Sequence, residues 1–196
     1  KSGSKQRDTV LREMTAALDL LENQYGESRI VTVGLCTGAE NGFRLAVADQ
    51  RVIGNVWLDG YGYRTLKGGF LKYWLKFSSL PMILARLKKR LTKSQLPESE
   101  EIGDDGEWQW TLPEKAELST QLTDLTARGA KILAIYSGGV ISYYTYRDQF
   151  RDSFPGAPFL HNMDFEYFGQ ADHTYKINKD RQLMFERVQD WLTREF

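Results

Sequence analysis

The sequence is poor in side chains that bind metals or form cross-links: it has a single cysteine, Cys36, and two histidines, His161 and His173. One cysteine excludes an internal disulfide framework. A lone thiol fits a reducing compartment, and one cysteine with two histidines leaves too few ligands for a structural zinc site. We therefore expect a cytoplasmic protein without a metal centre.

Net charge and long apolar runs are also lacking. The 26 basic and 26 acidic residues cancel, so no net basic field gathers phosphates, which argues against nucleic acid as the main partner. The sequence has no run of about 18 apolar residues, the length that marks a membrane span, and the amino terminus is polar, unlike a signal peptide. The length of 196 residues suits one soluble domain with a sizeable core.

The most informative stretch is residues 30–49. An apolar, β-branched run is followed by Gly34-Leu-Cys-Thr-Gly38 and then by an alanine-rich helical pattern, which predicts strand, tight turn and helix. This is the context of a nucleophile elbow, in which Gly34 and Gly38 allow close approach of strand and helix. The Cys36 side chain would then lie beside the amino terminus of a helix, where a thiolate is favoured. The alternative is that Cys36 is a small buried hydrophobic residue.

The remaining pattern predicts an α/β fold with a mostly parallel sheet and flanking helices. We expect strands over 52–58, 131–136 and 163–168, and helices up to Gly26, over 118–129, over 142–154 and after a cap at Asn178. The core would comprise 1–60 and 113–196. Residues 61–112 would form an insertion of two amphipathic helices, divided by Pro81, that caps the site. Packing of these helices on the sheet, or on a membrane surface, is the alternative.

The order of these features resembles the α/β-hydrolase family, in which nucleophile, acid and histidine follow one another along the chain. The segments Gly34-Leu-Cys-Thr-Gly-Ala39 and Ala171-Asp-His-Thr-Tyr175 look most like serine-aminopeptidase-like hydrolases and hydrolases associated with exosortase systems. The resemblance implies that Cys36 is the nucleophile, His173 the general base and the Thr37 N–H an oxyanion donor. It implies hydrolysis of a small-molecule ester, thioester or amide without a cofactor. A non-catalytic binding protein of this fold and an acyltransferase remain alternatives.

The acid that orients His173 is left open between two aspartates. Asp59 ends the strand after the elbow, and Asp148 lies in the predicted helix over 142–154; we favour Asp59. Asp172 is expected to fix the histidine loop, and His161 to be structural or exposed. The aromatic residues Tyr61, Tyr63, Trp74, Tyr143 and Tyr144 are candidates to line an acyl pocket, with core and cap packing as the alternative.

The chain departs from the family in having no strand before the predicted helix that ends near Gly26. It therefore looks like the carboxyl-terminal portion of a larger hydrolase, and the strand at 30–33 would be an open edge. We expect residues absent here, or a second copy of the chain, to complete the sheet. The resemblance accounts for only one oxyanion donor, so the isolated chain is expected to show little esterase activity.

Overall fold

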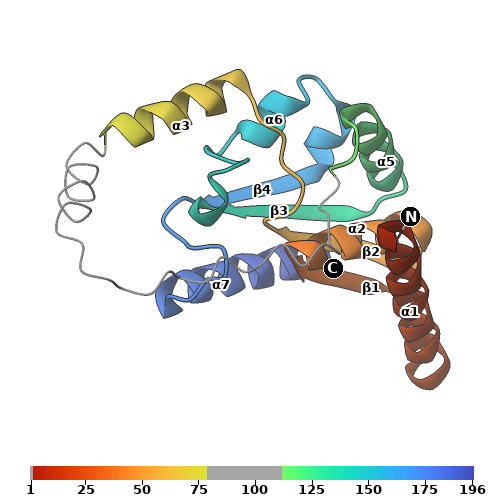
Figure 1. The fold of residues 1–196 in the computed structure, drawn as a ribbon. Coiled ribbons are helices and arrows are strands. Elements are labelled where there is room, and N and C mark those ends of the chain that lie inside the picture. The colour runs from red at the N-terminus through yellow and green to blue at the C-terminus, as the bar shows by residue number, and fades with distance from the viewer. Residues whose placement is uncertain (1, 79–111) are drawn as a thin grey trace.

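The computed structural model describes residues 2–78 and 112–196, and within them four parallel strands form one sheet in the order β1-β2-β3-β4 (Figure 1). The strands are β1 Ile30–Leu35, β2 Val52–Leu58, β3 Lys131–Ser137 and β4 Met163–Phe168. Each is rich in apolar and β-branched or aromatic residues, the composition that favours a buried strand. The predicted strands are confirmed, and so is the α/β class.

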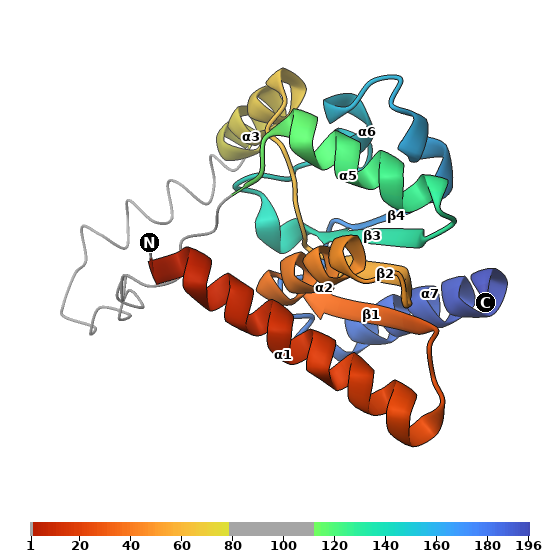
Figure 2. The same ribbon diagram turned by 90° about the vertical axis from the view of Figure 1, so that its right-hand side faces the viewer.

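Helices cover both faces of this sheet (Figures 1 and 2). They are α1 Ser2–Tyr25, α2 Thr37–Ala48, α3 Leu66–Ser78, α5 Lys115–Ala127, α6 Gln149–Ser153 and α7 Asn178–Glu195, with short 3-10 turns at Gly138–Val140 and Pro158–Asn162. The side chains of α1, α2, α5 and α6 pack into one apolar cluster, and those of α7 pack into another on the opposite face. The result is the layered arrangement that lets a parallel sheet bury both faces.

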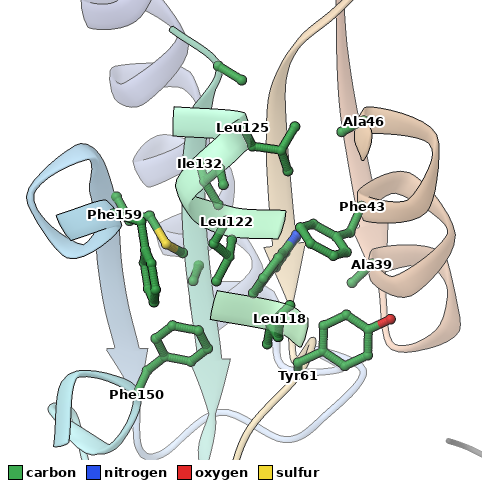
Figure 3. Close-up of a cluster of buried hydrophobic side chains, with 14 of the residues drawn as sticks. Ala39, Phe43, Ala46, Tyr61, Leu118, Leu122, Leu125, Ile132, Phe150 and Phe159 are labelled. Carbon is green, nitrogen blue, oxygen red and sulfur yellow. The ribbon is translucent and has the colours of Figure 1, made fainter. Parts of the chain in front are cut away.

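The larger cluster is built around aromatic residues (Figure 3). Trp57 of β2 meets Phe43 of α2 edge-to-face at 5.2 Å between ring centroids and Tyr61 at 5.8 Å. From α5, Leu118, Leu122 and Leu125 lie at helical spacing on the same cluster and are almost completely buried. This packing holds α2 and α5 against the sheet, and so fixes the loops at the carboxyl ends of β1 and β2.

The strands are in a register that brings their carboxyl ends together. Leu35 of β1 pairs with Leu58 of β2, which pairs with Ile135 of β3, so Cys36 and Asp59 follow directly at one edge of the sheet. Ligand sites of open parallel sheets lie at this edge. β1 is also the outermost strand on one side of the described sheet, as expected, and its Val33 side chain is 56% exposed.

Some predicted helices differ from the observed ones. The helix expected over 142–154 forms only over Gln149–Ser153, because the Gln149 side chain bonds to backbone groups of the preceding residues that a helix would use. Its amide donates to the carbonyl oxygens of Tyr63 and Tyr143 and accepts from Thr145. Asn178 is the first residue of α7 rather than its cap, which is Ile177. The predicted second insertion helix and the rest of the insertion to residue 111 lie outside the described residues.

None of the helices in the described ranges is both long and apolar enough to cross a bilayer.

Candidate active site

Cys36 lies at the sharp turn between β1 and α2. Its backbone has φ 55° and ψ −116°, a strained conformation for a residue with a Cβ and the one that a nucleophile elbow imposes. Gly34 makes the turn feasible. A Cβ at Gly34 would lie 2.5 Å from the Ala39 nitrogen and closer still to the Gly38 carbonyl group. The half-buried thiol therefore stands where strand and helix pack backbone to backbone.

The second glycine of the motif has a different role from the one expected. A Cβ at Gly38 would meet no described atom within 4 Å, so close packing does not require glycine there. The prediction that both glycines are needed for close approach is thus right for Gly34 and wrong for Gly38.

Asp59 stands beside Cys36 at the end of β2. The Cys36 N–H donates to the Leu58 carbonyl oxygen at 2.9 Å, and the Asp59 N–H donates to the Ile135 carbonyl oxygen at 2.8 Å. Asp59 has φ 54° and is fully buried. A residue held in this backbone region by two neighbouring strands has its carboxylate fixed in direction.

The buried carboxylate of Asp59 has three polar contacts. Its Oδ1 accepts from the Ser137 N–H at 2.6 Å, and its Oδ2 accepts from the Ser137 hydroxyl at 2.6 Å. His173 Nδ1 lies 2.8 Å from the same Oδ2. A carboxylate on Nδ1 fixes the ring and its tautomer and leaves Nε2 for proton transfer. The expected contact between His173 and one of two aspartates is therefore made by Asp59, across 114 positions of sequence.

Ser137 was not recognised from the sequence as part of the site. Its partner Asp59 lies 78 positions away, and a serine after a buried strand carries no signal by itself. The signal that could have found it is its place at the carboxyl end of a strand next to β2, opposite the candidate acid.

The histidine loop is seated on the turn after β3. A Cβ at Gly139 would lie 2.9 Å from the His173 Cα, and one at Gly138 would lie 2.8 Å from the Gly169 carbonyl carbon. The Asp172 carboxylate accepts from the N–H groups of Thr174 and Lys176. The Thr174 hydroxyl also donates to this carboxylate at 2.8 Å. That bond first, and the two backbone bonds after it, hold the pKa of Asp172 below its ordinary value. Asp172 thus fixes the loop, as expected, and does not orient the imidazole.

The backbone N–H of Thr37 begins α2 directly after Cys36. The first N–H groups of a helix have no partner within it, and the helix dipole favours negative charge there. The geometry is compatible with an oxyanion donor at Thr37. It is the one such donor that we assign among the described residues.

The other candidate residues lie elsewhere. Asp148 is exposed at the start of α6, and His161 is exposed in the turn before β4. Tyr61 and Tyr63 are buried in the core, where the Tyr63 hydroxyl donates to the Pro113 carbonyl oxygen at 2.6 Å. Packing, the alternative left open for these two tyrosines, is what the structure shows.

The last three aromatic candidates lie in three different environments. Tyr144 is buried and stacks on Tyr136 with 3.6 Å between ring centroids. Trp74 is 63% exposed on α3. Tyr143 differs from both, because its hydroxyl donates to the Asp59 carbonyl oxygen at 2.9 Å. Burial first, then the charges of Asp59 and Cys36, raise the pKa of the Tyr143 hydroxyl. Tyr143 is thus bonded directly to Asp59.

Over the described ranges, no cluster of three or more histidine, cysteine, aspartate or glutamate side chains is arranged to hold a metal ion. The comparisons with known proteins add no assignment, because no protein-family model matches the chain and no curated protein is significantly similar to it.

Proposed function

We propose that the protein is a hydrolase of the α/β-hydrolase type, which cleaves an ester, thioester or amide of a small molecule through Cys36, His173 and Asp59. The observation that carries the proposal is the 2.8 Å contact between Asp59 and His173 at the sheet edge where Cys36 occupies a strained strand-to-helix turn. Asp59 and His173 meet at the edge of the sheet where Cys36 also lies, and the three follow one another along the chain in the order of a hydrolase triad.

The proposed reaction is acyl transfer to water. His173 Nε2 accepts the proton of the Cys36 thiol, and the thiolate attacks the substrate carbonyl carbon. The Thr37 N–H stabilises the oxyanion, and His173 returns the proton to the leaving alcohol, thiol or amine. A water molecule, deprotonated by the same imidazole, then hydrolyses the acyl-enzyme. Asp59 holds the imidazole in place and stabilises its charged form.

Buried polar contacts explain why Asp59 suits this role. A buried carboxylate without partners costs several kcal/mol, whereas Asp59 accepts from a backbone N–H, a hydroxyl and an imidazole. The reducing cytoplasm is the location that we propose, since the nucleophile must stay a free thiol.

The test is the rate at which iodoacetamide alkylates Cys36 near neutral pH. A free thiol is only a few per cent thiolate at pH 7, so an activated one should react about tenfold faster than a small free thiol. His173→Ala and Asp59→Asn should remove this advantage. His161→Ala and Asp148→Asn are matched controls, because both residues are exposed and away from Asp59, and they should leave the rate unchanged.

Alkylation is the first readout because it does not depend on a complete oxyanion hole, whose donors are each worth about 100- to 1000-fold in turnover. Hydrolysis of an aryl thioester, abolished by Cys36→Ala, is the second. Slow labelling that His173→Ala does not change would overturn the proposal and favour a binding protein. An acyl-enzyme that forms on Cys36 and transfers only to an added amine or thiol would indicate an acyltransferase.

A further inference from the structure

A cavity of about 290 Å³ lies between α3 and the segment that follows β3. Lys72 and Tyr73 line it from the α3 side, and Ile141, Ser142 and Tyr143 line it from the other. Its volume is at the small end of the range for ligand sites. Its walls combine three apolar or aromatic residues, Tyr73, Ile141 and Tyr143, with a larger number of polar ones.

The cavity shares a wall with the candidate active site. Tyr143 lines it, and the hydroxyl of the same residue donates to the Asp59 carbonyl oxygen at 2.9 Å. The ring lies close to the backbone of Gly62, where an added Cβ would be 2.9 Å from the Tyr143 Cδ2. A substrate whose carbonyl group lies at Cys36 could therefore extend past Tyr143 into this cavity.

The charged residues that line the cavity, among those that the structure describes, are all basic. They are Arg64 and Lys72, and no aspartate or glutamate of the described ranges lies with them. The Lys72 ammonium lies 3.5 Å from the Ser142 carbonyl oxygen, a neutral acceptor at long range. Lys67, on the same helix, is by contrast 3.6 Å from the Asp152 carboxylate and 4.4 Å from the centre of the Tyr146 ring. Among the described residues, neither Arg64 nor Lys72 has a carboxylate partner, whereas Lys67 has one.

We propose that this cavity is the subsite for an anionic group of the substrate, a carboxylate or a phosphate, so that the enzyme acts on acyl compounds that carry a negative charge away from the reacting carbonyl. The inference rests on the proposed function and names its substrate class. Arginine and lysine bind such groups by charge-assisted hydrogen bonds, and the apolar walls would contact the part of the molecule that joins the anion to the carbonyl.

The first test uses reagents that need no catalysis. N-ethylmaleimide and N-(2-carboxyethyl)maleimide carry the same reactive group, and only the second is anionic. The ratio is the rate of the anionic maleimide with Cys36 divided by the rate of N-ethylmaleimide, normalised by the same ratio for 2-mercaptoethanol. It should be about 3 to 10, the range of a partly exposed charge-assisted pair. Lys72→Met and Arg64→Gln should lower the ratio, and Lys72→Glu should take it below one.

Lys67→Met is the matched control, since it removes a lysine from α3 that does not line the cavity, and it should keep the ratio of the unmodified protein. Circular dichroism of each variant checks that it is folded. Added phosphate and acetate, compared with chloride at equal ionic strength, should slow the anionic reagent selectively, and the stronger competitor indicates the preferred anion.

The outcomes separate the two proposals. If Cys36 reacts rapidly and depends on His173, but prefers neither maleimide, or keeps its preference in both Lys72 variants, the anionic subsite is wrong and the hydrolase assignment stands. If Cys36 is unreactive toward both reagents and insensitive to His173→Ala, the proposed function fails. A matched pair of thioesters, pentanoyl and glutaryl, should show the same preference in kcat/KM, lost in Lys72→Met and kept in Lys67→Met.

Discussion

Replacing Gly34 with alanine should be one of the most damaging small changes available in this protein, whereas the same change at Gly38 should be harmless. At Gly34 the added Cβ would lie 2.5 Å from the Ala39 nitrogen and nearer to the Gly38 carbonyl group. Real Cβ atoms essentially never approach other atoms within 3.0 Å. All the obstructing atoms are backbone, so no side chain can turn aside, and α2 would have to move away from β1.

The magnitude follows from that movement. Overpacking a well-packed site costs about 1–3 kcal/mol when side chains can adjust. Since here α2 must shift although its Ala39 and Phe43 are packed in the core, we expect Gly34→Ala to lower the free energy of unfolding by at least about 3 kcal/mol. For a domain of this size the melting temperature should fall by about 6–12 °C.

Gly38→Ala is the control within the same motif. Its Cβ would meet no described atom within 4 Å, and the residue is helical. Alanine is favoured over glycine in a helix by about 0.5–1 kcal/mol, so the variant should be unchanged or slightly stabilised. Urea denaturation followed by tryptophan fluorescence measures both. A Gly34→Ala variant within about 1 kcal/mol of the unmodified protein, or equal losses at the two glycines, would refute this packing argument.

Two further predictions concern buried polar groups. Ser137→Ala removes the hydroxyl bound to the buried Asp59 carboxylate. It should cost about 1–3 kcal/mol of unfolding free energy and slow Cys36 alkylation, whereas Ser28→Ala, at an exposed serine in the loop before β1, should do neither. Glu40 is 3% exposed, and burial raises its pKa from 4.5, opposed by Arg7 and Arg44. A carboxyl pKa raised by folding gives stability that is full below pH 4.5 and is lost as the pH rises through the folded value. As the pH rises from acidic to neutral, the unfolding free energy of Glu40→Gln should therefore increase relative to that of the unmodified protein. A relative decrease would show that the 3.6 Å pair with Arg7 outweighs the effect of burial.

The local signals in the sequence determined the elements of the fold. Apolar, β-branched runs predicted β1, β2 and β3 within a residue or two, because burial on both faces of a parallel sheet requires such runs. The pattern of β4 is weaker, since it has no β-branched residue and includes two acidic ones. Gly34, two residues before Cys36, indicated the sharp strand-to-helix turn, since the steric constraint acts between residues four and five apart. A parallel sheet also requires that the carboxyl ends of β1 and β2 meet, so the sequence alone placed Asp59 near Cys36.

Where the prediction failed, contacts between distant segments decided the outcome. The sequence over 142–154 has a helical pattern, but only residues 149–153 are helical. The Gln149 side chain bonds to the backbone of Thr145 and Tyr143 and to that of Tyr63, 86 positions away. The aromatic candidates could not be distinguished in the sequence. In the structure Tyr61 and Tyr63 are buried in the core, and the Tyr143 hydroxyl bonds to Asp59.

The sequence by itself thus determined the α/β class, the strand order along the chain and the strained position of Cys36, all of which follow from short-range periodicity and sterics. Only the tertiary structure decided that Asp59 rather than Asp148 meets His173 and that Ser137 holds Asp59. It also showed that the loop with His173 rests on Gly138 and Gly139. These contacts join residues up to 114 positions apart, and which of several carboxylates is brought to an imidazole depends on how whole strands and loops pack, which no local pattern encodes.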